Sequence, residues 1–216
     1  MVYFETFSVP TADTLFLLIL SILALESARS IRFLYEHFLS EITEKSLTAF
    51  YYACSHAKID YSEFMNTTAR IALKLIPDSL QTQPVFLCVD DTIVSKFGTK
   101  FEDVSKLFDH AAHNGSNYLN GHCFVSVMLC VPVRNGDKVS YLSVPLGYRM
   151  WKKKESKLEL AASMIRQVMP EFHSKDHVII PCDSWDTKHN LVSIVDEYPN
   201  PDLIGNARSD SVMYDL

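Results

Sequence analysis

HCFVSVMLCVPVRNGDKVSYLSVPLG, residues 122–147, is the stretch that decides the fold class of this chain. β-Branched and aromatic residues fill both of its flanks, as is typical of strands that pack on a core. Between the flanks lies Asn135-Gly136, a dipeptide that strongly favours a tight hairpin turn. The sequence therefore predicts two antiparallel strands, near 122–133 and 138–147, joined by this turn.

Short apolar runs on either side of the hairpin predict further strands, and two segments with helical spacing lie between the later ones. The resulting order is strand, long loop, strand, turn, strand, helix, strand, helix, strand. This order is typical of an α/β domain, here over 81–216, with a mixed sheet flanked by helices. The runs are VFLCV (85–89), HVIIPC (177–182) and DLIGNA (202–207), and the helical segments are 157–169 and 187–198.

Residues 1–80 carry a helical pattern instead, and we predict a separate N-terminal helical region there. Pro10 and Asp13 give a helix start signal, and apolar residues then recur with helical spacing from Leu15 to Phe38. Two further helices are predicted over 44–56 and 61–76.

The most apolar run of the chain is LFLLILSILAL, residues 15–25. It is about half the length of a membrane span. Charged residues follow it at once, without a small-residue cleavage site. We therefore expect a buried helix rather than a membrane anchor or signal peptide, and a cytoplasmic protein.

The overall composition is that of an ordinary globular protein, with 48% hydrophobic and 21% charged residues. The net charge of −6 argues mildly against a dedicated DNA-binding module, which is usually basic, although net charge does not locate patches. The five cysteines include no CxxC pair, and four of them fall in predicted strands, so we expect reduced, buried thiols rather than a zinc site.

Acidic residues follow two of the apolar runs. Asp90 and Asp91 come directly after the first predicted strand, and Asp183 follows the strand at 177–182. In open α/β sheets, ligands bind at the carboxyl ends of the strands. Carboxylates brought together there need a cation, and an oxygen-only ligand set suits Mg²⁺ or Mn²⁺. Two such ions can activate an attacking oxygen and stabilise a leaving one at a phosphodiester.

A purely structural interpretation of these acids stays open at this point. An Asp after a strand commonly forms a turn or caps a helix, and Asp183 could cap the helix that follows it.

Five segments of the chain, taken in order, resemble one branch of the DDE-type transposases of bacterial insertion sequences. The resemblance covers residues 80–216 and implies an RNase H-like catalytic core that performs metal-dependent DNA strand cleavage and strand transfer. It also implies double-stranded DNA, at the element ends and the target, as the partner, and it allows a homodimer. The segments are VDDTIVSKFG (89–98), SKLFDHAAHNGSNYLNGHCFVSVMLCVPV (105–133), VPLGYRMW (144–151), CDSWDTK (182–188) and DLIGNARSD (202–210).

In that family, the first acid lies on the first strand and the second follows the fourth strand. The resemblance therefore assigns Asp183, together with Asp90 or Asp91, to catalysis and to binding of Mg²⁺ or Mn²⁺. Asp90 is favoured because it directly follows the hydrophobic run, whereas Asp91 could bond the following turn. The third acid of the family is a Glu on a later helix, to which no residue here is assigned. We thus expect a C-terminally truncated transposase that is inactive alone; the alternative is a non-catalytic remnant that binds DNA or self-associates.

Basic residues near 149–157 are the candidates for phosphate contact within the transposase interpretation. They are Arg149, Lys152, Lys153 and Lys154, to which we add Lys96. The alternative is a solvated loop and helix start, with the neighbouring Trp151 packing at the edge of the core rather than stacking on a base.

Two weaker patterns complete the set of candidates. The segment FDHAAHNGSNYLNGH has the HxxH spacing of His110 and His113, which can bind a metal when helical, but a structural or DNA-contacting loop is favoured. Cys182 with His189 could suggest a thiol nucleophile, yet an apolar strand disfavours a thiolate.

Overall fold

The structure is a computed structural model and describes residues 7–25, 30–98, 100–108, 117–182 and 189–205. The chain forms two compact units, Met1–Thr67 and Thr68–Leu216. The boundary between the units lies inside helix α6 (Tyr61–Lys74), whereas the sequence pattern placed it at residue 80.

The first unit is helical, as predicted. Its buried core consists of Leu18, Leu34, Leu39 and Phe50. Serine side chains cap two of the helices, since Ser30 accepts a hydrogen bond from the amide of Phe33 and Ser46 accepts one from the amide of Ala49. The elements are α2 (Val9–Ala24), α3 (Ile31–Leu34), the π-helical turn η1 (Tyr35–Leu39), α4 (Ser40–Ile42) and α5 (Leu47–His56).

Helix α2 contains the apolar run, and the prediction that this run is buried holds for one face only. Leu18 is buried, but Phe16 and Leu23 are 60% and 78% exposed. Across the described residues, no helix combines the length and the apolar character that crossing a membrane requires.

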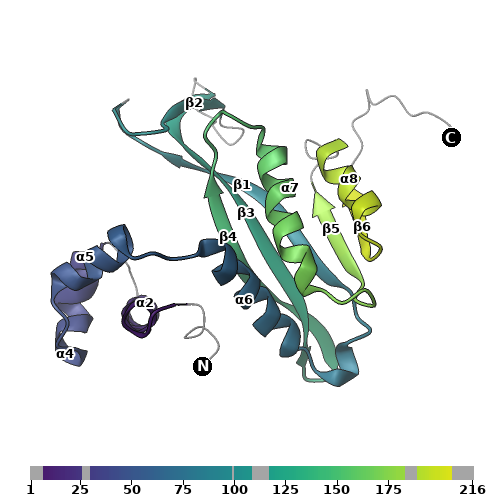
Figure 1. Cartoon of the computed structure of the whole chain (residues 1–216), viewed down its shortest axis with the longest axis horizontal. Helices are drawn as coiled ribbons and strands as arrows, with labels where there is room; N and C mark the ends of the chain where they lie inside the picture. Colours follow the sequence, from purple (N-terminus) through teal and green to yellow (C-terminus); the bar gives the residue numbers. More distant parts are fainter. Residues whose placement is uncertain (1–6, 26–29, 99, 109–116, 183–188, 206–216) are drawn as a thin grey trace. The chain divides into compact units, whose positions relative to one another are not determined.

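The second unit contains a mixed sheet of six strands, flanked by helices as predicted. The strand order is β2-β3-β1-β5-β6, and β4 also pairs with β3 (Figure 1). Strand β3 is antiparallel to β1, β2 and β4, whereas β5 runs parallel to both β1 and β6. The strands are β1 (Val85–Ser95), β2 (Ser105–Phe108), β3 (Tyr118–Asn135), β4 (Lys138–Met150), β5 (Val178–Cys182) and β6 (Pro201–Gly205).

The hairpin of β3 and β4 is confirmed, with longer strands than predicted. Asn135 pairs with Lys138, so Gly136 and Asp137 are the two turn residues. Gly136 has a φ of +61°, and a positive φ at the first central position is the feature of a type II′ turn. The turn is therefore centred one residue later than Asn135-Gly136. Strand β2, inside the predicted long loop, was missed because four residues carry too little pattern.

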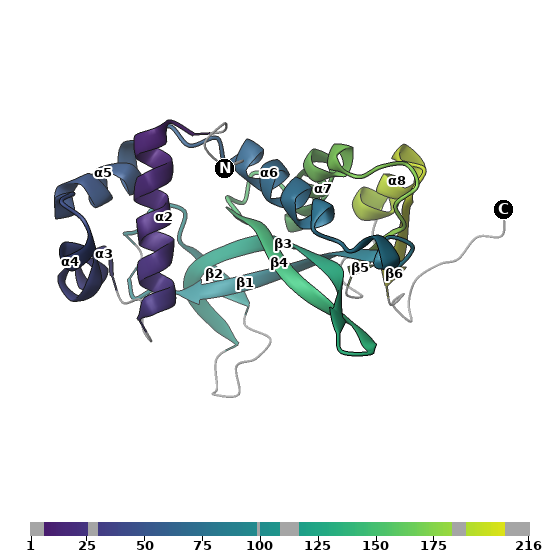
Figure 2. The ribbon, with the colours of Figure 1, turned by 90° about the horizontal axis from the view of Figure 1, so that it is seen from below.

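Helices cover one face of this sheet. Figure 2 shows α7 (Lys157–Val168), α8 (His189–Glu197) and the part of α6 that belongs to the second unit on the same face. Alternate residues of β3 point to them and form the core, namely Cys123, Val125, Val127 and Leu129. Helix α7 contributes buried side chains in return, among them Ala161 and Ile165.

Local sequence also explains where α7 begins. Ser156 accepts a hydrogen bond from the amide of Glu159, and the Glu159 carboxylate accepts one from the amide of Ser156. This capping box fixes the first turn, and it therefore places Lys157 beside strand β1.

Candidate functional site

The two adjacent acids lie in the middle of strand β1, not at its end. Pairing with β3 continues past them to Ser95, with Asp90 opposite Ser126 and Asp91 opposite Val125. The prediction that the strand stops at the acids is therefore wrong. Burial falls after the apolar run 85–89, while the β-branched residues that follow continue the ladder with β3.

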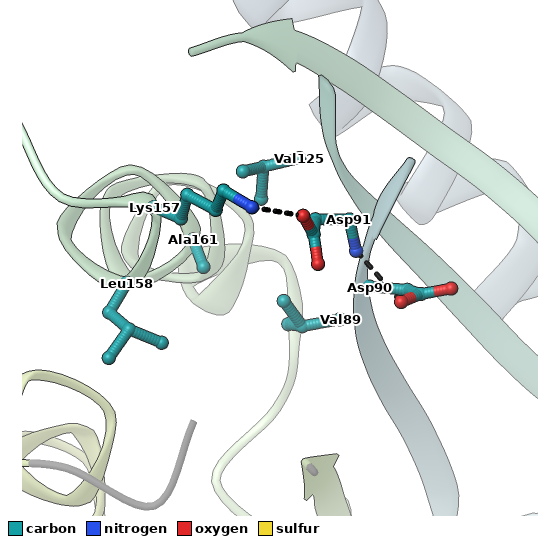
Figure 3. Close-up of a pocket in the computed structure, with 7 residues that line it drawn as sticks. All are labelled: Val89, Asp90, Asp91, Val125, Lys157, Leu158 and Ala161. Atoms are coloured by element: carbon teal, nitrogen blue, oxygen red, sulfur yellow. Dashed lines mark hydrogen bonds and ion pairs between the residues drawn. The ribbon is translucent and has the colours of Figure 1, made fainter. Parts of the chain in front are cut away.

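A mid-strand position sends the two carboxylates to opposite faces of the sheet, because successive side chains alternate. Asp91 shares its face with the buried Val85 and Leu87, which is the face that α7 covers. In Figure 3, Asp91 points toward Lys157, whereas the side chain of Asp90 points away from it.

Asp91 is held by an ion pair at the start of α7. Its Oδ2 accepts a hydrogen bond from the ammonium of Lys157 and another from the thiol of Cys123, whose sulfur is 3.2 Å away. The side chains of Lys157 and Asp91 are 37% and 42% exposed, so water reaches the pair. The pocket around it is lined by Val89, Asp90, Asp91, Val125, Lys157, Leu158 and Ala161 (Figure 3).

The protonation states of this cluster follow from its surroundings. Burial by itself lowers the pKa of Lys157, but the hydrogen bond and charge of Asp91 outweigh it and raise that pKa above its ordinary value. Burial, together with the hydrogen bond to Asp91, raises the pKa of Cys123 to about 11. At neutral pH the cluster thus contains an ammonium and a protonated thiol, and neither is a nucleophile.

Asp90 is exposed and interacts only locally in the described residues. Its Oδ1 accepts a hydrogen bond from the amide of Asp91 at 2.8 Å, and its carbonyl accepts one from the hydroxyl of Ser126 at 3.1 Å. The two acids therefore differ in kind, because Asp91 is neutralised by a fixed ammonium and Asp90 faces solvent.

The third predicted acid, Asp183, lies outside the described residues, as do His110 and His113. What the structure does show is the strand that precedes Asp183. Strand β5 lies beside β1 and parallel to it, as predicted for these two strands, with Val85 opposite Val178 and Phe86 opposite Ile179. Within the described part of the chain, no group of three or more His, Cys, Asp or Glu side chains is placed to hold a metal ion.

The predicted DNA-contacting residues fall into two groups, those that are already bound by other side chains and those that are exposed. Arg149 is bound to α7 through Ser163, at 3.2 Å, and through Gln167, which is a structural role. Lys152 forms an ion pair of 3.2 Å with Asp103. Lys153 and Lys154 are exposed on the loop before α7, and Lys153 has a left-handed φ of +58°.

Two aromatic contacts complete the description of this region. Lys96 is partly buried, with its ammonium 5.9 Å from the ring centroid of Phe101. Trp151 closes the lysine loop, because its indole N–H donates to the carbonyl of Glu155 at 2.7 Å. The ring of Trp151 also lies near α7, with the ammonium of Lys157 5.8 Å from its centroid.

Sequence reasoning did not single out Lys157 and Cys123 as part of this site. A signal for Lys157 was present, since a lysine in the first turn of a helix is opposed by the helix dipole and needs an acidic partner. Cys123 carried no such signal, because its contact with Asp91 depends on the pairing of β1 with β3.

Comparisons with models of protein families, with curated proteins and with solved structures gave no match.

Proposed function

We propose that this chain is the RNase H-like catalytic core of a DDE-type DNA transposase, in which Asp90 and Asp183 bind a divalent cation for DNA strand cleavage and strand transfer. The observation that carries the proposal is the parallel pairing of β1 with β5. Together with the order of motifs along the chain, it supports a shared site for the acid on β1 and the acid that follows β5.

The register of this pairing favours Asp90 over Asp91 as the partner of Asp183. Phe86 lies opposite Ile179, and counting four residues further along both strands reaches Asp90 and Asp183. Opposed residues of neighbouring parallel strands point to the same face of the sheet. Continuing the register would thus direct both carboxylates to the face that Asp91 does not use.

The contacts of the two acids favour the same choice. Lys157 already neutralises Asp91, and a divalent cation would have to displace that ammonium. Asp90 has an exposed carboxylate without such a competitor among the described residues. We therefore assign Asp90 to cation binding, and Asp91 to the attachment of β1 to α7.

The donor chemistry fits Mg²⁺ or Mn²⁺, since carboxylates are oxygen ligands and such ions prefer them. When bound, the ion would supply charge stabilisation and an activated oxygen at a phosphodiester. The chain's own contribution among the described residues is the rigid mounting of Asp90 inside a paired strand. Lys153 and Lys154, exposed on the loop before α7, are the residues we propose for phosphate contact.

A test of the cation site is titration of the chain with Mn²⁺, followed by electron paramagnetic resonance of the free ion. We expect weak binding that is lost in Asp90→Asn and in Asp183→Asn and kept in Asp91→Asn, which is the matched neighbour. Binding that depends on Asp91 alone would move the site to the pocket beside Lys157. Absence of binding in the parent chain would remove the metal assignment.

A second candidate function is a non-catalytic DNA-binding or self-associating protein of the same descent. The ion pair of Asp91 with Lys157 favours this candidate, because it gives one of the two adjacent acids a structural role. Because no residue of this chain is assigned as the family's third acid, nicking of supercoiled plasmid DNA in Mn²⁺ is measured on the chain extended by a segment that supplies this acid, with Asp183→Asn as the comparison. Mn²⁺ binding without nicking supports the second candidate, whereas nicking that Asp183→Asn abolishes supports the first.

A further inference from the structure

Two cysteines and a methionine lie together on the face of the sheet opposite to the one that α7 covers. Leu87 and Leu129 are opposed on β1 and β3, and both are fully buried on the helix-covered face. Because side chains alternate along a strand, the next residues, Cys88 and Cys130, point to the other face. Both thiols are only half-buried there, and α7 and α8 lie on the far side of the sheet (Figure 2).

The two thiols are neighbours across the pairing of β1 with β3. Their Sγ atoms lie 3.9 Å apart. Met128 is directly opposite Cys88 on the neighbouring strand, so its thioether side chain points to the same face. The Sγ of Cys130 also forms a hydrogen bond of 3.5 Å with the hydroxyl of Ser143 on β4. Three sulfur-containing side chains from two strands therefore share one small area of the sheet.

The spacing of the two sulfurs suits a bridging ion better than a disulfide. Two thiolates that bind one ion through metal–sulfur bonds of about 2.3 Å are about 3.8–4.0 Å apart, for bond angles between tetrahedral and trigonal. The observed separation of 3.9 Å lies in this range. A disulfide requires about 2.05 Å between its sulfurs. In addition, Cys88 and Cys130 are diagonal rather than opposed residues, and diagonal residues lie further apart than those that a disulfide commonly joins.

We propose that Cys88, Cys130 and Met128 bind a soft monovalent cation of the Cu⁺ class. The inference does not rest on the proposed function, because Mg²⁺ and Mn²⁺ need oxygen ligands. Thiolate and thioether sulfur together select Cu⁺. A structural zinc site needs four ligands, and no third His, Cys, Asp or Glu side chain of the described residues joins the two thiols. Binding of the ion would displace the protons of both thiols into the solvent.

The side chains around the sulfurs also suit a soft ion. Phe86 lies opposite Cys130 and makes an edge-to-face contact with Tyr141, with the ring centroids 5.0 Å apart. An apolar border of this kind limits the access of water, and it therefore favours sulfur ligands over a hydrated hard cation. The ion can still enter from solvent, because Ser143 and Tyr141 are exposed on the same strand.

Anaerobic titration of the full chain with Cu⁺, in competition with the chromogenic chelator bicinchoninate, tests the proposal. We expect a single tightly bound ion in the parent chain. Cys88→Ser and Cys130→Ser should each weaken its binding at least about 100-fold, and Met128→Leu, which keeps the size of the side chain, about tenfold. Copper-edge X-ray absorption should show a third sulfur neighbour in the parent chain that Met128→Leu lacks.

Two control variants should keep the affinity of the parent chain. Cys54→Ser removes an exposed thiol of the first unit, away from the proposed site. Asp90→Asn changes an oxygen ligand on the same strand and face as Cys88. Retention of Cu⁺ binding in Asp90→Asn also separates this test from that of the Mn²⁺ site. Circular dichroism checks that every variant stays folded.

Three outcomes would overturn the proposal. A parent chain that takes no Cu⁺ from bicinchoninate would do so. Binding that Cys54→Ser weakens as much as Cys88→Ser does would show that the ion associates with any accessible thiol. The third is displacement of Cu⁺ by an equal concentration of Zn²⁺, since this result would assign the two thiols to a harder ion.

Discussion

Replacing Asp91 by Asn tests the division of roles between the two adjacent acids through the stability of the fold. The substitution keeps the size of the side chain but removes its charge, so the ammonium of Lys157 loses the partner that neutralises it. Asp90→Asn is the matched control, because Asp90 is exposed and its neighbours in the described residues are backbone groups and solvent.

The expected loss follows from the exposure of the pair. Side chains that are 37% and 42% exposed are partly screened by water, and a pair of this kind contributes about 1 kcal/mol. The amide oxygen of Asn can still accept a hydrogen bond from the half-buried ammonium, but it is a weaker acceptor than a carboxylate, and this difference adds about 1 kcal/mol more. We therefore expect Asp91→Asn to lower the free energy of unfolding by about 2 kcal/mol, and Asp90→Asn to change it by less than about 0.5 kcal/mol.

The assay is urea unfolding followed by circular dichroism, with thermal unfolding as a second measurement. For a domain of this size, about 2 kcal/mol corresponds to a decrease in Tm of about 4–8 °C. The double variant Asp91→Asn/Lys157→Met isolates the interaction, and its loss should be smaller than the sum of the single losses by about 1 kcal/mol. Equal losses in Asp90→Asn and Asp91→Asn, or additive losses in the double variant, would refute the assignment of Asp91 to the attachment of β1 to α7.

The remaining predictions concern two glycines and the buried thiol of the second unit. Gly121→Ala should lower the free energy of unfolding by about 1–3 kcal/mol, because a Cβ there would lie 2.6 Å from the backbone carbonyl oxygen of Val94. A Cβ at Gly136 would meet no atom within 4 Å, but the φ of this residue is +61°. Gly136→Ala should therefore lower the free energy of unfolding, measured in urea, by about 1 kcal/mol. The folded state keeps the Cys123 thiol protonated up to a pKa of about 11, against 9.0 for an ordinary cysteine. The contribution of the protonated thiol to the free energy of unfolding is therefore complete below pH 9 and is lost as the pH rises toward 11. Above pH 9, the Tm of Cys123→Ala should therefore fall less steeply with pH than the Tm of the parent chain. Maleimide at pH 8 should label the exposed Cys54 long before Cys123. An unchanged slope or equal labelling rates would show that Cys123 is not buried as described.

The local patterns of the chain determined its elements. The β-branched and aromatic residues identified the two strands of the hairpin, and the dipeptide Asn135-Gly136 indicated the turn, because both signals depend on the backbone preferences of a few neighbouring residues. Helical spacing likewise located α7, whereas the capping box at Ser156 was recognised in the structure. The α/β class followed from the order of these elements alone.

The strand boundaries and the orientation of the acids could not be predicted from local sequence patterns. The apolar run 85–89 was interpreted as a whole strand, although β1 extends to Ser95, because hydrophobicity reports burial rather than pairing. As a result, the preference for Asp90 over Asp91 rested only on its position directly after the apolar run. Their separation onto opposite faces follows only from the ladder with β3.

The sequence by itself determined the α/β elements, the hairpin and the candidate acids, because residues close in the chain set these features. The tertiary structure alone decided that Asp91 meets Lys157, 66 positions away in the chain, and that α2 turns its larger apolar residues outward. Periodicity shows that a helix has an apolar face, but only the packing of the other helices decides which face they cover. For the same reason, a lysine and a carboxylate from distant segments form one site only after the sheet and α7 have brought β1 and the start of that helix together.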